Sequence, residues 1–394
     1  SFIGQLFGCS GYKVVFIDID QTIIDGLNNH GSYRVVIKGE KEEEIIVPNV
    51  EAISALEKDK VIEAVSTTGI LAVSVGKNIL EKIIPVIAAG LVLRNSNNPG
   101  IPLDIILAEN MRSAADFVRE HLMKNLPSGF PLETMVGLVE TSIGKMVPII
   151  PQAELEKDPL VVFAEPYNTL IVDRKGFMSP IPQIRGLAPK SNIKAWVDRK
   201  AFIHNLGHAT AAYYGHYLHP EAVYMYEVLG NREVLLFTRA VMLQSASILR
   251  AAYPDEFTFA ELEDHIDDLI SRFRNKALQD TIFRVGQDLI RKLGPDDRFM
   301  GAIHLARQYQ MPYDLILEAM TYAFYLKASD ENGNRYAQDI MFDNHLLVGI
   351  ESVLQDVCGF DSIADKKMIE EFINQYAAHT KTESYRGNKK SIGE

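Results

Sequence analysis

The first half of the chain alternates short apolar runs with segments of helical periodicity. Apolar runs bounded by turn residues predict buried strands, and apolar positions three and four apart predict helices. The predicted strands are residues 12–18, 32–38, 44–47, 70–75 and 103–108, with further extended runs at 135–140 and 160–164 that widen the sheet. The predicted helices are residues 21–27, 78–94 and 112–124. This alternation is typical of an α/β fold with a mainly parallel sheet.

From about Ser191 the pattern becomes helical throughout. Predicted helices cover residues 193–218, 220–229, 232–252, 259–273 and 280–293, with others up to Ala378. The proline-rich stretch 180–189 predicts the joint between the halves. We therefore expect an α/β domain over residues 1–190, a mostly α-helical domain over residues 191–378, and a polar, frayed tail over residues 379–394.

Composition and charge limit the partners of the chain. Of its 394 residues 47% are hydrophobic and 23% are charged, which fits two globular domains with apolar cores. The formal charge of -12 and the pI near 5.4 argue against nucleic acid and anionic membranes as partners. Cys9 and Cys358 stand far apart, and neither a signal-like segment nor a run of 18 apolar residues occurs. We therefore expect a cytoplasmic protein.

The segment KAFIHNLGH sets Lys200, Asn205 and His208 on one predicted helix. At about 100° per residue, His208 lies about 80° and Asn205 about 140° from Lys200, so all three can line one wall of a cavity. A lysine that loses its proton is a base, and asparagine and histidine can bind an alcohol or carbonyl oxygen. Together these residues supply the base and the oxygen-binding groups that alcohol oxidation without a metal requires. The alternative is a long helix that carries these residue types by chance.

Histidine pairs on the same helix suggest a second hypothesis, a metal site. His204 and His208 are four residues apart and His216 and His219 three apart, which are spacings that metal ligands use. The HNLGH string lacks the glutamate that zinc peptidases place after their first histidine, and no third ligand is evident. For His216 and His219, near the predicted helix end, a surface or capping role is the more ordinary interpretation.

Asp18 ends the first predicted strand, and its position fits two different functions. In a dinucleotide-binding fold, an acid at the end of the second strand accepts hydrogen bonds from the adenosine ribose and repels the phosphate of NADP. This interpretation makes residues 2–9 the helix after a phosphate-binding loop. It places the glycine-rich loop and its strand before Ser1.

The string DIDQT at residues 18–22 also matches the Asp-x-Asp-x-Thr signature of haloacid-dehalogenase-type phosphatases. In those enzymes the first aspartate is the nucleophile and the second a general acid, with magnesium between them. Under this alternative Asp18 and Asp20 are catalytic. The structural alternative is that Asp20 caps the following helix, with Thr22 in its first turn.

Several sequence blocks occur together in a fixed order. The most specific is DRKAFIHNLGHATAAYYG (198–215), followed by RVGQDLIRKL (284–293). The first half adds FIGQLF (2–7), SYRVVIKGE (32–40), ILAVSVGKNILEKIIPVIAAGL (70–91) and LAENMR (107–112). Together these blocks resemble the polyol-specific long-chain dehydrogenase/reductase family, nearly from Ser1 to Ala378. The resemblance implies a Rossmann-like NAD-binding domain over residues 1–190 and a helical substrate domain over residues 191–378.

The resemblance also implies roles for single residues. Lys200 is expected to be the general base, with Asn205 and His208 orienting the reacting oxygen. The further positions that match substrate-facing residues of the family are Asn110, Arg284 and Lys292. Asp18 matches the ribose-binding acid, which implies NAD as the cofactor, and no metal is expected.

The reaction implied by the resemblance is NAD-dependent interconversion of a hexitol phosphate and a ketose phosphate, such as mannitol 1-phosphate and fructose 6-phosphate. The binding partner is then a small polyol or sugar phosphate. The nearest alternative is a hexuronate reductase acting on tagaturonate or fructuronate, and the alternative from another class is the magnesium-dependent phosphatase. Two departures from the family pattern bear on the substrate. Gly144 and Lys145 stand where an Asp-Arg pair is expected, and Leu170 stands where tryptophan is usual.

Overall fold

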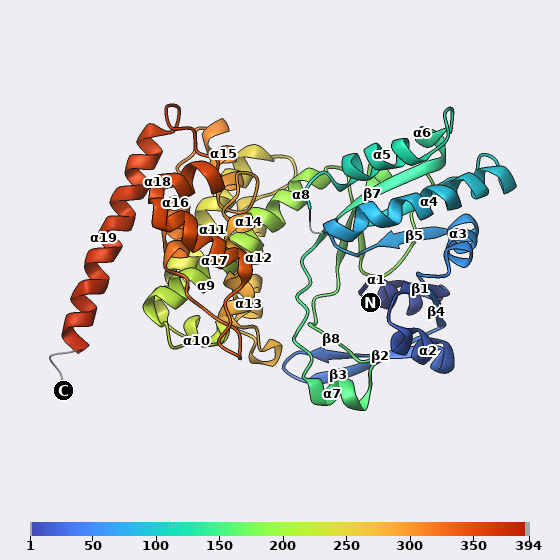
Figure 1. The fold of residues 1–394 in the computed structure, drawn as a ribbon, viewed down its shortest axis with the longest axis horizontal. Helices are drawn as coiled ribbons and strands as arrows, with labels where there is room; N and C mark the ends of the chain where they lie inside the picture. Colours follow the sequence, from blue (N-terminus) through green and yellow to red (C-terminus); the bar gives the residue numbers. More distant parts are fainter. Residues whose placement is uncertain (1, 110, 391–394) are drawn as a thin grey trace. The chain divides into compact units, whose positions relative to one another are not determined.

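The computed structural model describes residues 2–109 and 111–390, and the chain divides into two compact units. Unit 1 is Ser1–Val197 and unit 2 is Asp198–Glu394 (Figure 1). The division falls inside helix α8 (Ile193–Arg199), beyond the proline-rich stretch predicted as the joint. That stretch stays in unit 1 because β10 (Leu187–Lys190), which follows it, pairs in parallel with β9 (Leu170–Asp173).

Unit 1 contains a mixed five-stranded sheet in the order β10-β9-β7-β6-β5. As predicted, three of these strands are parallel: β5 (Ile70–Val73), β6 (Leu103–Leu107) and β7 (Val136–Ile143). The fourth, β9, runs antiparallel to β7. β5 ends two residues earlier than predicted, because the Glu109 carboxylate accepts hydrogen bonds from the Val75 and Gly76 amides at 2.8 and 2.9 Å.

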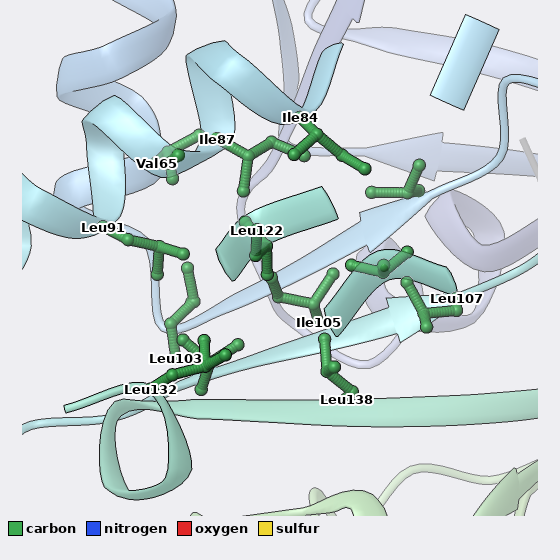
Figure 2. Close-up of a cluster of buried hydrophobic side chains, with 14 of the residues drawn as sticks. Val65, Ile84, Ile87, Leu91, Leu103, Ile105, Leu107, Leu122, Leu132 and Leu138 are labelled. Atoms are coloured by element: carbon green, nitrogen blue, oxygen red, sulfur yellow. The ribbon is translucent and has the colours of Figure 1, made fainter. Parts of the chain in front are cut away.

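One face of this sheet packs against three helices, α3 (Lys58–Thr67), α4 (Lys77–Asn97) and α5 (Ala114–Asn125). Figure 2 shows the core between them, where Leu103, Ile105 and Leu107 of β6 meet Leu91 of α4 and Leu122 of α5. On β6 the intervening Ile106 packs into a separate cluster on the opposite face. Both faces of this strand are therefore buried, which explains its continuous apolar run.

The strands predicted at 32–38 and 44–47 form an antiparallel hairpin of β2 (Ser32–Lys38) and β3 (Glu42–Pro48). The run predicted to widen the main sheet at 160–164 does not do so, because β8 (Val162–Ala164) pairs with β2 instead. An ion pair fixes this placement, since Arg34 Nε on β2 lies 3.2 Å from Asp158 Oδ2 just before β8. A pairing between segments so far apart in the chain leaves no local pattern to predict it.

The strand that carries Asp18 lies in a third, two-stranded sheet. β1 (Val14–Asp18) pairs in parallel with β4 (Val50–Ser54), a strand that the pattern did not predict. The prediction that β1 is buried on both faces is wrong: Val15 and Ile17 are 37% and 39% exposed, and the alternate residues pack inward. After β1 comes α2 (Gln21–His30), which ends at Gly31 in the left-handed conformation, φ 63°.

The remaining helices of unit 1 are short. They are α1 (Phe2–Gly8), α6 (Leu132–Met135) and α7 (Gln152–Lys157). α1 falls on the segment expected to be a helix before β1. The other two, and α3, were not predicted because their apolar positions are too few to give a clear periodicity.

Unit 2 is helical over the residues described. Its α-helices are α9 (Leu206–Leu218), α10 (Met225–Val228), α11 (Arg232–Ala252), α12 (Phe259–Phe273), α13 (Ile282–Gly286), α14 (Leu289–Lys292), α15 (Met300–Gln308), α16 (Asp314–Tyr322), α17 (Ala337–Val348), α18 (Ile350–Ser352) and α19 (Lys366–Lys390). The bounds of α11 and α12 agree with the prediction. Capping residues mark where both helices begin: Asn231 is the N-cap of α11, and Thr258 and Glu261 form a capping box at the start of α12.

Three predicted segments differ from the structure. The helix expected at 220–229 shrinks to α10. The helix expected at 280–293 breaks into α13 and α14 at Asp288, whose φ is 73°. There the Leu289 amide donates to Asp339 Oδ1 at 2.8 Å instead of continuing the helix. The backbone of α19 continues to Lys390, into the tail expected to fray, because extending an existing helix costs little per residue.

α11 and α9 approach each other closely in unit 2. A Cβ atom on Gly207 would come within 2.4 Å of Met242 Sδ, so any larger residue at this contact would require Met242 to move. Among the described residues, α11 is the one helix whose length and mean hydropathy of 1.3 would allow it to cross a membrane. A core helix of a soluble protein meets the same test, and α11 packs against α9, α12 and α16.

Candidate active site

The predicted helix at 193–218 contains a π-helical segment at its centre. Lys200–Asn205 forms a π-helix between α8 and α9, and the Leu206 amide donates to Ala201 O, five residues back. Such a bond stacks residues five apart, whereas α-geometry would leave Lys200 and Asn205 about 140° apart. The π-helix therefore brings the lysine and the asparagine to the same face.

Two side chains from elsewhere in unit 2 stabilise the π-helix. Ser245 Oγ donates to Phe202 O at 2.6 Å, and Arg298 Nη1 donates to Asn205 O at 3.3 Å. Ser245 is fully buried and Arg298 is nearly so. A buried carbonyl without a donor is costly, so these two bonds support the irregular backbone on which Lys200 and Asn205 lie.

Lys200 is half-buried, and its ammonium lies in an environment that disfavours charge. Burial, followed by the positive charge of Arg298, lowers the pKa of Lys200 from 10.5 to about 8, against the opposite pull of Asp297. Arg298 is held in place by Asp297, whose Oδ1 accepts from both its amide and its Nε at 2.7 and 2.9 Å. A lysine with this pKa is a usable base near neutral pH.

His208 lies one turn beyond Asn205, on α9, and its ring is fixed by two contacts. The imidazole stacks on Phe273, with centroids 4.3 Å apart and planes 5° from parallel. Its Nε2 lies 3.4 Å from Asp280 Oδ2, a long contact that is not well aligned as a hydrogen bond. Burial lowers the pKa of His208, and Asp280 only partly counteracts this, so the ring is neutral near pH 7.

Asp280 joins His208 to Arg284. Its Oδ1 lies 2.6 Å from Arg284 Nε, and its side chain is 5% exposed, while that of Arg284 is 40% exposed. Burial tends to raise the pKa of Asp280, but the contacts with His208 and Arg284 outweigh it and lower the pKa to about 2. At neutral pH, Asp280 is therefore an ionised carboxylate that lies between the neutral imidazole of His208 and the guanidinium of Arg284.

Of the other two predicted substrate residues, the structure describes Lys292, which is buried and hydrogen-bonded to the main chain. Lys292 is 6% exposed, and its Nζ donates to Val285 O at 2.6 Å. Burial and the nearby Arg298 and Arg291 lower the pKa of Lys292 well below its usual value. Asn110 lies outside the described residues.

The histidine pairs are not arranged as metal ligands. The rings of His204 and His208 have centroids 6.2 Å apart, and His208 turns Nε2 toward Asp280. His216 is buried, not at the surface as expected, and its Nε2 accepts from the Lys327 amide at 3.2 Å. His219 follows α9 as its C-cap residue and contacts Asn231. Within residues 2–109 and 111–390, no group of three potential ligands is placed to hold a metal ion.

Asp18 and Asp20 have separate roles in unit 1. Asp20 Oδ1 accepts from the Thr22 and Ile23 amides and caps α2, which confirms the structural alternative for this residue. Asp18, at the carboxyl end of β1, accepts the Ile19 and Asp20 amides with Oδ1 at 2.7 and 3.0 Å. Its Oδ2 is then available to accept hydroxyl groups, which fits the ribose of a dinucleotide.

Both departures from the family pattern occupy structural positions in unit 1. Lys145 Nζ donates to Tyr167 O and Asn168 Oδ1 at 2.8 and 3.1 Å, and lies over the ring of Phe2. Leu170 is fully buried in β9.

Three residues of the candidate site were missed by the sequence analysis: Ser245, Asp280 and Arg298. Arg298 had a weak signal, because it follows a Gly-Pro turn and a pair of aspartates, which is unusual just before an apolar helix. Ser245 and Asp280 had none, since a serine within a helix and an aspartate before one are ordinary.

An α/β unit with an acid at a strand end, followed by a helical unit with a low-pKa lysine, is typical of two-domain dehydrogenases that use a nicotinamide dinucleotide. The chain belongs to the mannitol dehydrogenase family. Its residues 1–186 match the mannitol dehydrogenase Rossmann domain, and residues 192–380 match the mannitol dehydrogenase C-terminal domain. It is therefore an NAD(H)-dependent oxidoreductase of the polyol dehydrogenase type, and the phosphatase alternative is not favoured.

A solved structure with a TM-score of 0.75 shows the same fold. A substrate-free D-sorbitol dehydrogenase matches with a TM-score of 0.75 and 14% identity, over 95% of this chain and 89% of that one. More distant matches include D-mandelate dehydrogenase with NADH, with a TM-score of 0.44 and 14% identity over 82% of this chain and 95% of that one. A probable 2-dehydropantoate 2-reductase from Bacillus subtilis has a TM-score of 0.45 and 11% identity, over 83% and 96% of the two chains.

Proposed function

We propose that the chain interconverts a hexitol phosphate and a ketose phosphate, mannitol 1-phosphate and fructose 6-phosphate, in the manner of a mannitol-1-phosphate 5-dehydrogenase. Lys200 is the general base. The observation that carries the proposal is the π-helix, which places Lys200, with its pKa lowered to about 8, on the same face as Asn205. The reaction needs no metal, because a neutral lysine can accept the proton and an amide can stabilise the oxygen.

Three residues of unit 2 have different roles in the reaction. Neutral Lys200 Nζ accepts the proton of the substrate hydroxyl while hydride leaves the same carbon, and it returns that proton when the ketose is reduced. Asn205 Nδ2 donates to the oxygen on which negative charge develops, and His208 orients the substrate oxygens. NAD, when bound, supplies the hydride acceptor, and Asp18 selects it over NADP by repelling the additional phosphate.

The phosphate part of the proposal depends on Arg284. A phosphate near neutral pH is a dianion, and a guanidinium binds it with paired hydrogen bonds. Arg284 is 40% exposed, and its Nε is already fixed by Asp280, which leaves the other nitrogens for a ligand. Lys292 is buried and its Nζ already donates to Val285 O, so we assign it no contact with the phosphate.

Steady-state assays with NADH on fructose 6-phosphate, fructose and tagaturonate test the substrate. We expect fructose 6-phosphate to give a kcat/KM at least about 10-fold above that of fructose, since one charge-assisted contact contributes more than 1 kcal/mol. Arg284→Gln should remove most of this preference, while Arg250→Gln, at the exposed end of α11, serves as the control and should not. If tagaturonate gives the highest kcat/KM, the protein is a hexuronate reductase. If free fructose is reduced as well as its phosphate, the phosphate assignment is wrong.

A further inference from the structure

Asp280 is a buried carboxylate placed between two candidate substrate-binding residues. Its oxygens are divided between them, Oδ1 toward Arg284 Nε at 2.6 Å and Oδ2 toward His208 Nε2 at 3.4 Å. Its main chain is also held, because its carbonyl accepts from the Met225 amide at 2.9 Å. Asp280 therefore has little freedom to turn away from either partner.

Only one ring nitrogen of His208, Nε2, faces the carboxylate of Asp280. Stacking on Phe273 fixes the ring plane, and Nε2 is the nitrogen that faces Asp280. This 3.4 Å contact is not aligned as a hydrogen bond, but the negative charge of Asp280, which can only accept, favours the tautomer with its hydrogen on Nε2. In a neutral imidazole the other nitrogen, Nδ1, is then an acceptor.

An acceptor at Nδ1 changes what His208 can bind. The carbonyl oxygen of a ketose carries no hydrogen, and neither does the alkoxide formed when Lys200 removes the proton. Nδ1 cannot donate to either of them. The group that it can bind is a hydroxyl that keeps its own hydrogen throughout the reaction.

We propose that Asp280 is a positioning residue that holds His208 with its hydrogen on Nε2, so that Nδ1 accepts a hydrogen bond from a substrate hydroxyl on a carbon next to the reacting one. This inference rests on the proposed polyol reaction and refines it. Lys200 and Asn205 contact the reacting oxygen, and His208 binds the hydroxyl on the adjacent carbon. The site thereby selects α-hydroxy ketones over simple ketones. The same carboxylate binds Arg284 Nε, which leaves the remaining guanidinium nitrogens for a ligand.

Asp280→Asn separates the contact with Arg284 from the contact with His208 without changing the shape of the side chain. Its Oδ1 can still accept from Arg284, but its Nδ2 is a donor that faces His208 Nε2 and forces the hydrogen onto Nδ1. We expect kcat/KM for the best ketose to fall roughly 10- to 100-fold, the loss typical when a partner that orients a functional histidine is removed. Asp280→Glu should recover part of it. The control is Asp267→Asn, which removes another carboxylate paired with an arginine, on α12.

Deoxy substrates distinguish positioning from a general structural effect. The best ketose should be compared with its 1-deoxy and 3-deoxy analogues. In the unaltered enzyme one analogue should lose at least about 10-fold in kcat/KM, because a buried acceptor is left unpaired. In Asp280→Asn that ratio should fall toward 1. An equal loss on all three substrates, with the ratio unchanged, would overturn the proposal.

A spectroscopic measurement tests the tautomer without any turnover. In the full chain labelled with ¹⁵N-histidine, with the His208 signals assigned by their loss in His208→Gln, the shifts should show hydrogen on Nε2, and on Nδ1 in Asp280→Asn. Hydrogen on Nδ1 in the unaltered protein overturns the role of Asp280 and leaves the proposed reaction intact. The predicted tautomer in a protein that reduces no ketose would instead refute the proposed function.

Discussion

Arg298 Nη1 donates to the main-chain carbonyl of Asn205 across 3.3 Å, so one guanidinium serves both the backbone and the chemistry of the π-helix. Its hydrogen bond satisfies a carbonyl at the end of the π-helix. Its charge lowers the pKa of Lys200 at the beginning of the same segment. The backbone of the π-helix and the protonation of Lys200 are therefore coupled through a single side chain.

The first prediction concerns pH. Because the pKa of Lys200 is lowered to about 8, alcohol oxidation, which needs the neutral amine, should gain in kcat/KM up to about pH 8 and level off above it. Ketose reduction needs the protonated amine and should decline above the same pH. Arg298→Gln removes the repelling charge, so both midpoints should move upward. Unshifted midpoints in Arg298→Gln would show that another group titrates.

The second prediction concerns the base itself. Lys200→Ala should lower kcat by roughly 100- to 10,000-fold, since the proton has lost its acceptor. The Kd for NADH should stay nearly unchanged, and added small primary amines should restore part of the rate. Lys194→Ala, on the exposed face of α8, is the matched control. Turnover of Lys200→Ala within a few-fold of the unaltered enzyme would refute the assignment.

The third prediction concerns the backbone of the site. Ser245→Ala removes a hydroxyl that donates to the buried Phe202 carbonyl and should lower the free energy of unfolding by about 0.5–1.5 kcal/mol. Activity should fall as well, because the π-helix carries Lys200 and Asn205. Ser247→Ala removes a hydroxyl that bonds within its own helix, to Leu243 O, and should cost less. Urea unfolding of the two variants, together with their kcat values, makes the comparison.

The fourth prediction concerns the cofactor. Asp18→Ser should reduce the preference for NAD over NADP, since the carboxylate that repels the ribose phosphate is gone. Asp25→Ser removes an exposed carboxylate on α2 and controls for the change in net charge. The ratio of kcat/KM for NADH and NADPH is the measurement. An unaltered enzyme that is faster with NADPH would show that Asp18 does not face the ribose.

The fifth prediction concerns metals. Dialysis against a strong chelator should leave the rate of ketose reduction unchanged, because Lys200 and Asn205 supply the proton transfer and the oxygen contact. Elemental analysis of the active protein should find no stoichiometric zinc or magnesium. Loss of activity that only one metal restores would contradict this mechanism.

The predictable parts of the molecule are those with a local signal. β2, α11 and α12 agree with the pattern because alternation, periodicity and capping residues lie within the elements themselves. Lys200, Asn205 and His208 could be singled out as candidates because they share one short block. The π-helix could not, because Ser245 and Arg298 stabilise it from 43 and 93 residues away. The pairing of β8 with β2 was missed for the same reason.

The π-helix also divides one long helix into two faces that are out of phase. A π-turn holds one more residue than the α-turn it replaces, so residues before Lys200 and after Asn205 are offset by about 100° relative to a continuous α-helix. Deleting Ala201 would restore the α-helical phase without removing any functional side chain. Every such side chain would be present, and Lys200 and Asn205, then four residues apart, would lie about 40° from each other on one face of the helix. The π-helix therefore accommodates one additional residue while Lys200 and Asn205 remain one turn apart.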